Sequence, residues 1–124
     1  MNITINSNTD IFYNQLLELL SSFKPIKNLR EREITILAEI MKQHYVHKHV
    51  TKNENLRRNL VFSRESKQAM CNKLGISRDS LNNNLSILRK KNIMSKDNFL
   101  IKTLNIFPDK EFTFAITFKL KDNE

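Results

Sequence analysis

Residues 66–94 read SKQAMCNKLGISRDSLNNNLSILRKKNIM, and the order of small, apolar and capping residues in this stretch decides the expected fold. A first short helix ends before Gly75, and a second begins after Ser77, whose hydroxyl is suited to cap it. Glycine at the corner permits a positive φ angle, and the aliphatic Ile76 fills the space between the helices. These features together predict a helix-turn-helix.

The second helix of this pair has an apolar and a polar face. At about 100° per residue, Leu81, Leu85 and Leu88 lie on the inner face. The polar residues around the other face, at the helix ends and in the turn that follows are candidates for DNA contact: Ser77, Arg78, Asp79, Asn82, Asn83, Ser86, Arg89, Lys90, Lys91 and Lys96. Asparagine pairs with adenine, arginine with guanine or phosphate, and lysine with phosphate. The alternative is a polar face that is only solvated.

An N-terminal helix is expected to begin at Thr9 or Asp10 and to end before Pro25. Its apolar residues form a face too broad for one neighbouring helix to cover, so we expect it to contact a second subunit. The residues assigned to this contact are Phe12, Leu16, Leu19, Leu20 and Phe23. Residues 1–27 are therefore assigned to an N-terminal arm and helix, and residues 28–124 to the main domain.

The segment that follows predicts another helix. It opens at Asn28, where Glu31 completes a capping box, and it ends near His47. Residues 48–59 are polar and aperiodic, which indicates a loop, with at most one helical turn, leading to a short strand at residues 60–62.

The C-terminal part of the chain has the period of a β-strand. Strands are predicted over residues 99–106 and 111–120, with a turn at Pro108 and Asp109. In the second of these, apolar residues alternate with small or polar ones: Phe112, Phe114, Ile116, Phe118 and Leu120. This alternation is typical of a half-buried strand.

The passage from Ser66 to Met94 resembles the winged helix-turn-helix family, which includes MarR-like regulators and winged-helix proteins of phages. The segment from Leu29 to Met41, LREREITILAEIM, is similar to the first core helix of such domains. The resemblance covers residues 28–120 and implies an α+β, mainly α fold: a three-helix core and a β-hairpin wing, here with an extra N-terminal helix. It also implies that Lys96 or Lys110 lies at a wing tip beside a phosphate or the minor groove.

The composition is that of one basic domain. The chain has 124 residues, with 21 lysines and arginines against 13 acidic residues and a net charge of +8. Such a charge favours a polyanionic partner, which is DNA, RNA or an anionic membrane. The abundance of Asn, Lys and Ile is typical of an AT-rich genome, such as those of many phages and some bacteria.

Several classes of protein are excluded by composition. The single cysteine, Cys71, cannot form an internal disulfide, and we interpret it as a packing residue of the first helix of the pair. No apolar run approaches the roughly 18 residues of a membrane span, and the N-terminus lacks the pattern of a secretory signal. The single glycine argues against phosphate-binding loops and catalytic elbows. We therefore expect a cytoplasmic protein that is not an enzyme and has no cofactor.

Three histidines lie close together at the end of the helix from residue 28: His44, His47 and His49. His44 and His47 share a helical face, which leaves a metal site as an alternative. No cysteine or well-placed carboxylate completes such a site, so we expect no metal and interpret the histidines as capping or solvated side chains.

These features predict a sequence-specific double-stranded DNA-binding protein, a regulator of transcription or replication. We expect it to be a homodimer whose two helix-turn-helix units read a palindromic site. The alternative is a structural component, such as a phage particle protein, in which the same domain binds other protein subunits of an assembly.

Overall fold

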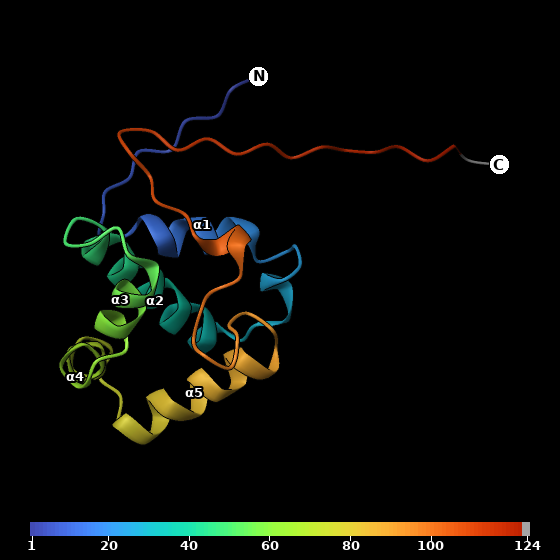
Figure 1. The fold of residues 1–124 in the computed structure, drawn as a ribbon. Coiled ribbons are helices and arrows are strands. Elements are labelled where there is room, and N and C mark those ends of the chain that lie inside the picture. Colours follow the sequence, from blue (N-terminus) through green and yellow to red (C-terminus); the bar gives the residue numbers. More distant parts are fainter. Residues whose placement is uncertain (123–124) are drawn as a thin grey trace.

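The computed structural model describes residues 1–122, and within them the chain forms a bundle of helices with an extended segment at each end (Figure 1). The elements follow in the order α1 (Phe12–Leu20), η1 (Ile26–Asn28), α2 (Glu31–Lys48), α3 (Glu54–Val61), α4 (Arg64–Leu74), α5 (Arg78–Lys90) and η2 (Lys102–Leu104), where η denotes a short 3-10 turn.

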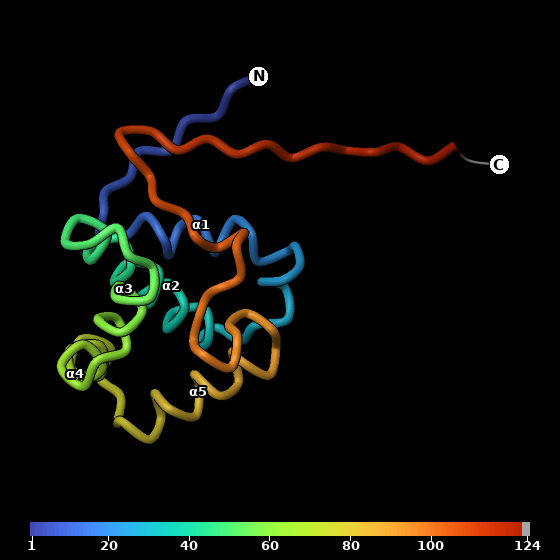
Figure 2. Tube along the Cα trace, in the orientation of Figure 1, coloured from blue at the N-terminus to red at the C-terminus, as the bar shows by residue number. Residues whose placement is uncertain are grey.

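Helix α2 is the centre of the bundle. It packs against α1, α3 and α5, and the path of the chain around it can be followed in Figure 2. Ile36, Leu37, Ile40 and Met41 line this helix and are at most 1% exposed. Four large apolar side chains removed from water contribute about 1.5–3 kcal/mol each, so α2 supplies a substantial part of the packing energy.

The helix-turn-helix is formed as predicted, by α4 and α5. Gly75 ends α4 in the left-handed region with φ of 65°. The N–H of Ile76 then donates to the carbonyl of Cys71 at 3.1 Å. Ser77 caps α5 by accepting from the N–H of Ser80, and Ser63 caps α4 in the same way. The capping and corner residues therefore act as their types predict.

The prediction of a loop over residues 48–59 and a strand at residues 60–62 is wrong. Residues 54–61 form helix α3, which buries Val61 completely against α2 and is capped by Asn53, whose side chain accepts from the N–H of Leu56 at 3.0 Å. The apolar residues at the end of this segment thus belong to the last turn of a helix.

The β-hairpin wing is not seen, and the α+β part of the predicted fold is therefore wrong, although a mainly α chain agrees with the structure. Across residues 1–122 there is no strand or sheet, only an isolated antiparallel bridge between Met94 and Leu100. The tight turn between them lies where the wing would begin. Leu100 and Leu104 then turn into the core around η2, which prevents residues 99–106 from forming one side of a hairpin.

The second predicted strand of the wing, residues 111–120, has no partner. Residues 109–122 run extended and exposed across the end of the molecule that carries α1 (Figure 1). Strands need ladder hydrogen bonds on at least one edge, and the described residues supply none here. Lys110 consequently lies at the start of an exposed arm instead of at a wing tip.

The starts of the first two long helices differ in detail from the expectation. The side chain of Asn8 accepts from the N–H groups of Asp10 and Ile11, just before α1, at 2.9 and 3.2 Å, and neither Thr9 nor Asp10 caps the helix. Helix α2 begins at Glu31, and its capping box uses Glu33, which accepts from the N–H of Arg30 at 3.2 Å. Glu33 therefore takes the role expected of Glu31 at the start of α2, whereas α1 begins without a side-chain cap.

Candidate nucleic-acid interface

Helix α5 has the two faces that the sequence predicts. Leu81, Leu85 and Leu88 are at most 2% exposed and pack against the rest of the core. The predicted contact residues that are exposed are Ser77, Asp79, Asn82, Asn83, Lys90 and Lys96, and those that are half-buried are Arg78, Ser86, Arg89 and Lys91. The outer face of α5 is thus polar and open to solvent along its length.

Arg78 is held in place by α4. Its Nη2 atom donates to the carbonyl of Arg64 and to the side-chain oxygen of Gln68, both at 3.2 Å. These residues line a shallow hollow between the first turns of the two helices. The contact joins the start of α5 to the start of α4 and fixes the guanidinium at the edge of the outer face.

Lys91 has a structural partner. Its Nζ donates to the carbonyl of Asn28 at 2.8 Å and forms an ion pair with Glu33, whose side chain is 3% exposed. Burial by itself raises the pKa of Glu33, but the hydrogen bonds from Lys91 and from the N–H of Arg30, with the charges of both residues, outweigh it and lower the pKa. Lys91 therefore joins the C-terminal end of α5 to the start of α2, and its charge is used inside the molecule.

Replacing Lys91 with methionine is expected to destabilise the fold by roughly 2 kcal/mol, because it leaves the buried carboxylate of Glu33 without its cation. This is below the roughly 3–5 kcal/mol of a fully buried pair, since about a third of the Lys91 side chain meets water. Urea denaturation measures the loss. Lys90→Met, at the exposed neighbouring position, is the matched control, and an equal loss in both variants would contradict this account.

Arg89 and the turn after α5 form a second contact. The Nη1 atom of Arg89 donates to the side-chain oxygen of Asn98 at 2.7 Å, and Asn98 adopts a left-handed φ of 66°. Lys96 lies exposed in the same turn.

The three successive asparagines of α5 differ in exposure. Asn84, the last of them, is buried and donates to the carbonyl of Ser80 at 2.8 Å. The open asparagines of α5 are thus Asn82 and Asn83.

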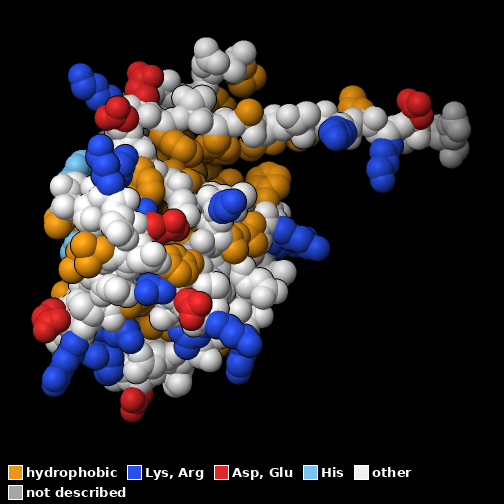
Figure 3. All heavy atoms as spheres, in the orientation of Figure 1, with side chains coloured by type: hydrophobic (Ala, Val, Ile, Leu, Met, Phe, Trp, Pro, Cys, Tyr) orange, Lys and Arg blue, Asp and Glu red, His pale blue; other side chains and the backbone are white. Residues whose placement is uncertain are grey.

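Basic side chains gather over α4 and α5. On the face shown in Figure 3, Lys and Arg side chains lie over this part of the molecule with a few acidic ones among them. Lys73 is neutralised in part by Glu39, 2.9 Å away. Asp79 adds a negative charge to the first turn of α5. Glu65 is exposed beside Arg64 in the first turn of α4, and a further exposed basic side chain is that of Lys90, with Lys67 half-buried.

Other basic residues stabilise contacts between α2, α3 and the segment after α5. The guanidinium of Arg57 and the Nζ of Lys48 lie 4.9 and 5.0 Å from the ring centre of Phe107. Arg58 lies 4.5 Å from the ring centre of Phe99. These cation–π contacts attach the segment after α5 to α2 and α3. Part of the net charge is therefore engaged in holding the chain together.

Four of the five residues assigned to a subunit contact lie on α1, and Phe23 follows this helix. Leu16 is 4% exposed and belongs to the core, and Phe12 and Leu20 are partly buried against it. Leu19 and Phe23 are each 47% exposed. Most of this broad apolar face is covered within the chain, by α2 and by the C-terminal segment, where Phe12 and Phe112 meet edge to face with ring centres 5.5 Å apart.

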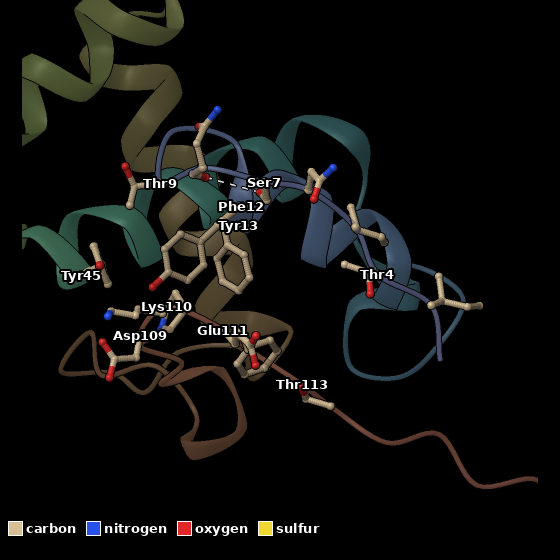
Figure 4. A pocket seen from close by; sticks show the side chains of 16 residues that line it. Thr4, Ser7, Thr9, Phe12, Tyr13, Tyr45, Asp109, Lys110, Glu111 and Thr113 are labelled. Carbon is tan, nitrogen blue, oxygen red and sulfur yellow. Dashed lines mark hydrogen bonds between the residues drawn. The ribbon is translucent and has the colours of Figure 1, made fainter. Parts of the chain in front are cut away.

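A cleft of about 530 Å³ lies between the N-terminal arm and the start of the C-terminal segment (Figure 4). Phe12 and Tyr13 form its floor, and Asp109, Lys110 and Glu111 lie on one side. Tyr13 donates to the carbonyl of Ile106 at 2.6 Å, and burial raises its pKa. The tyrosine therefore anchors the chain at the point where the extended segment leaves the core.

The three histidines differ in burial: His44 is buried, His47 is half-buried and His49 is exposed. The ring centre of His44 lies 6.4 Å from that of Phe62. Burial, followed by the charges of Arg57 and His47, lowers the pKa of His44 to about 4. Neither ring nitrogen of His44 has a hydrogen-bond partner, and no group of three potential metal ligands occurs among residues 1–122. Cys71 is buried, as its predicted packing role requires.

None of the helices described in residues 1–122 has the length and apolar character needed to cross a membrane. No protein-family model, curated protein or solved structure matches this chain.

Proposed function

We propose that the protein is a sequence-specific double-stranded DNA-binding protein, a regulator of transcription or replication, that places the outer face of α5 in the major groove. The observation that carries the proposal is the exposure of Asn82, Asn83 and Lys90 on a helix whose leucines all point inward. A helix set on a helix-turn-helix with its polar face open fits the width of the major groove. The proposal includes a cytoplasmic location, which is the host cytoplasm or the virion if the protein is encoded by a phage.

Different residues would supply affinity and selectivity. Arg64, Lys67 and Lys90 surround the outer face and are suited to phosphate contacts, which give affinity that falls as salt rises. Asn82 and Asn83 are suited to pair with adenine in the groove. Lys91 is assigned no DNA contact in this proposal, because Glu33 already engages its charge.

The direct test is a fluorescence anisotropy titration of a random-sequence duplex at two salt concentrations. Non-specific binding by such proteins falls in the range of about 10⁻⁴ to 10⁻⁶ M, so micromolar protein at low salt suffices to detect it. Lys90→Glu is expected to weaken binding about tenfold and to lower the salt slope by about 1, because one phosphate contact is lost and a repulsive charge is added.

Lys52→Glu is the matched control. It makes the same charge change at an exposed lysine in the connection between α2 and α3. Its affinity should stay near that of the unaltered protein. Equal weakening in both variants would show that only net charge matters, and α5 would then have no special role.

Selectivity needs a separate measurement with a duplex enriched from a random pool. On that duplex Asn83→Ala is expected to cost about 1–3 kcal/mol of binding, and on random DNA it should cost little. If the unaltered protein fails to bind any duplex at low salt, the proposal is wrong. The polar face of α5 would then be better explained as a contact for other protein subunits.

A further inference from the structure

The C-terminal segment of the described chain has the extended backbone and alternating sequence of a β-strand but no strand beside it. Residues 108–122 run extended into solvent (Figure 1), and within the described chain their backbone N–H and C=O groups form no backbone hydrogen bond. The apolar residues of one parity grow more exposed towards the end, reaching 53% at Ile116, 86% at Phe118 and 93% at Leu120. An isolated strand of this kind has an open edge and an open apolar face.

We propose that this segment pairs with the same segment of a second copy of the chain, antiparallel and centred on Ile116. With a two-fold axis at that position, each residue lies opposite the residue of the second chain that is equally far from Ile116 on the other side. The apolar face then pairs Phe112 with Leu120, Phe114 with Phe118, and Ile116 with itself. Aromatic and aliphatic cross-strand pairs of this kind stabilise antiparallel sheets.

The charges agree with this register. Across the two-fold axis, Glu111 lies opposite Lys121, and Lys110 lies opposite Asp122. All four side chains are exposed in the single chain and free to meet a second one. Each pair occurs twice in the dimer, once on each side of the axis, so the strand is complementary to itself in charge as well as in apolar pattern.

Other registers fit less well. In an antiparallel pair, directly opposite residues point to the same face of the sheet. If the axis lies between two residues, even-numbered residues oppose odd-numbered ones, and each face then mixes apolar and polar side chains. An axis on Ala115 keeps the faces separate and pairs Glu111 with Lys119 and Asp109 with Lys121, but it sets Leu120 opposite Lys110. The axis on Ile116 is the register that pairs all the apolar residues with one another.

The base of the strand is already fixed to the helical core. Phe112 packs on Phe12 of α1, and Tyr13 holds the carbonyl of Ile106 just before the strand begins. A two-stranded ribbon is marginal alone, and attachment to two helical domains supplies the support that it lacks. This inference concerns a second copy of the chain and is independent of the proposed DNA binding.

Sedimentation equilibrium of the full chain tests the pairing. The unaltered protein is expected to show a concentration-dependent mass that approaches twice the chain mass of 14.7 kDa. Ile116→Lys sets two lysines against each other on the axis and should weaken the dimer at least tenfold. Val50→Lys, at an exposed apolar residue after α2, is the control and should leave the mass unchanged. Because Ile116 lies outside the core, circular dichroism should show an unchanged helical fold.

A charge exchange identifies the register. Glu111→Lys and Lys121→Glu should each weaken the dimer, since like charges then face each other, and the double variant should restore it. Rescue of Glu111→Lys by Lys119→Glu instead would move the axis to Ala115 and overturn the register centred on Ile116. A monomer at all concentrations, or a dimer insensitive to Ile116→Lys, would overturn the proposal and indicate that another segment or partner covers this strand.

Discussion

Replacing Leu81 with alanine is expected to lower the free energy of unfolding by about 3–4 kcal/mol. Leu81 is fully buried on the inner face of α5, among side chains of the central core. Removing its methyl groups loses transfer free energy and leaves a cavity that a well-packed bundle fills only in part. Because native domains are stable by only about 5–15 kcal/mol, this one change removes a large share of the total.

Urea denaturation with an unchanged m-value measures this loss, and the melting temperature should fall by about 10–15 °C. Leu56→Ala is the matched control, because Leu56 is also on a helix but is 48% exposed. Its cost should stay within about 0.5 kcal/mol. Similar losses in the two variants would mean that α5 does not pack on the core as described.

Acidification is expected to destabilise the protein through His44, by roughly 3 kcal/mol between neutral pH and about pH 4. The pKa of His44 is about 4 in the folded chain against an ordinary value of 6.5, and each unit is worth about 1.4 kcal/mol. Between these two values the unfolded chain binds a proton that the folded chain does not. Stability therefore falls as the pH drops through this window and reaches its lower level below about pH 4.

The variant His44→Leu isolates this effect, since it places an apolar side chain of similar size in the buried site. Unfolding in urea at several pH values should show a shallower decline for His44→Leu than for the unaltered protein. His49→Leu, at an exposed position, should keep the full decline. The carboxylates of Asp10 and Glu33, whose pKa values are lowered by lysine partners, add an acid-sensitive component common to all three proteins. Identical slopes in all three would refute the role of His44.

The helix-turn-helix was predictable because its signals are local. Gly75 provides the left-handed corner, Ser77 caps the next helix, and leucines at helical spacing define the inner face of α5. Each of these effects depends on residues within one or two turns of one another, so a single sequence contains the information.

Helix α3 was missed because its apolar pattern is short and its composition is polar. Asn53 caps it with a side-chain acceptor, and this residue was the available signal. Between Asn53 and Val61 only two leucines break the polar run, so periodicity favoured neither helix nor loop. The burial of Val61 and Arg57 against the rest of the fold stabilises the helix, and this is a tertiary effect that the local sequence does not show.

The missing wing illustrates a different limit. Alternation in residues 111–120 identifies a chain able to form a strand, but a strand requires a partner, and alternation does not say where the partner lies. The candidate site shows the same limit. Lys91 was assigned to the DNA contact by its type and position, whereas its ion pair with Glu33 occupies it inside the molecule.

The tether between Arg78 and α4 has a consequence for the entropy of any encounter with an anion. A free arginine side chain loses up to about 2 kcal/mol of rotamer freedom when it is ordered. Arg78 is already ordered by the carbonyl of Arg64 and the side chain of Gln68. The folding of the chain has thus preorganised this guanidinium, and a phosphate that meets it would gain the contact without that entropic loss.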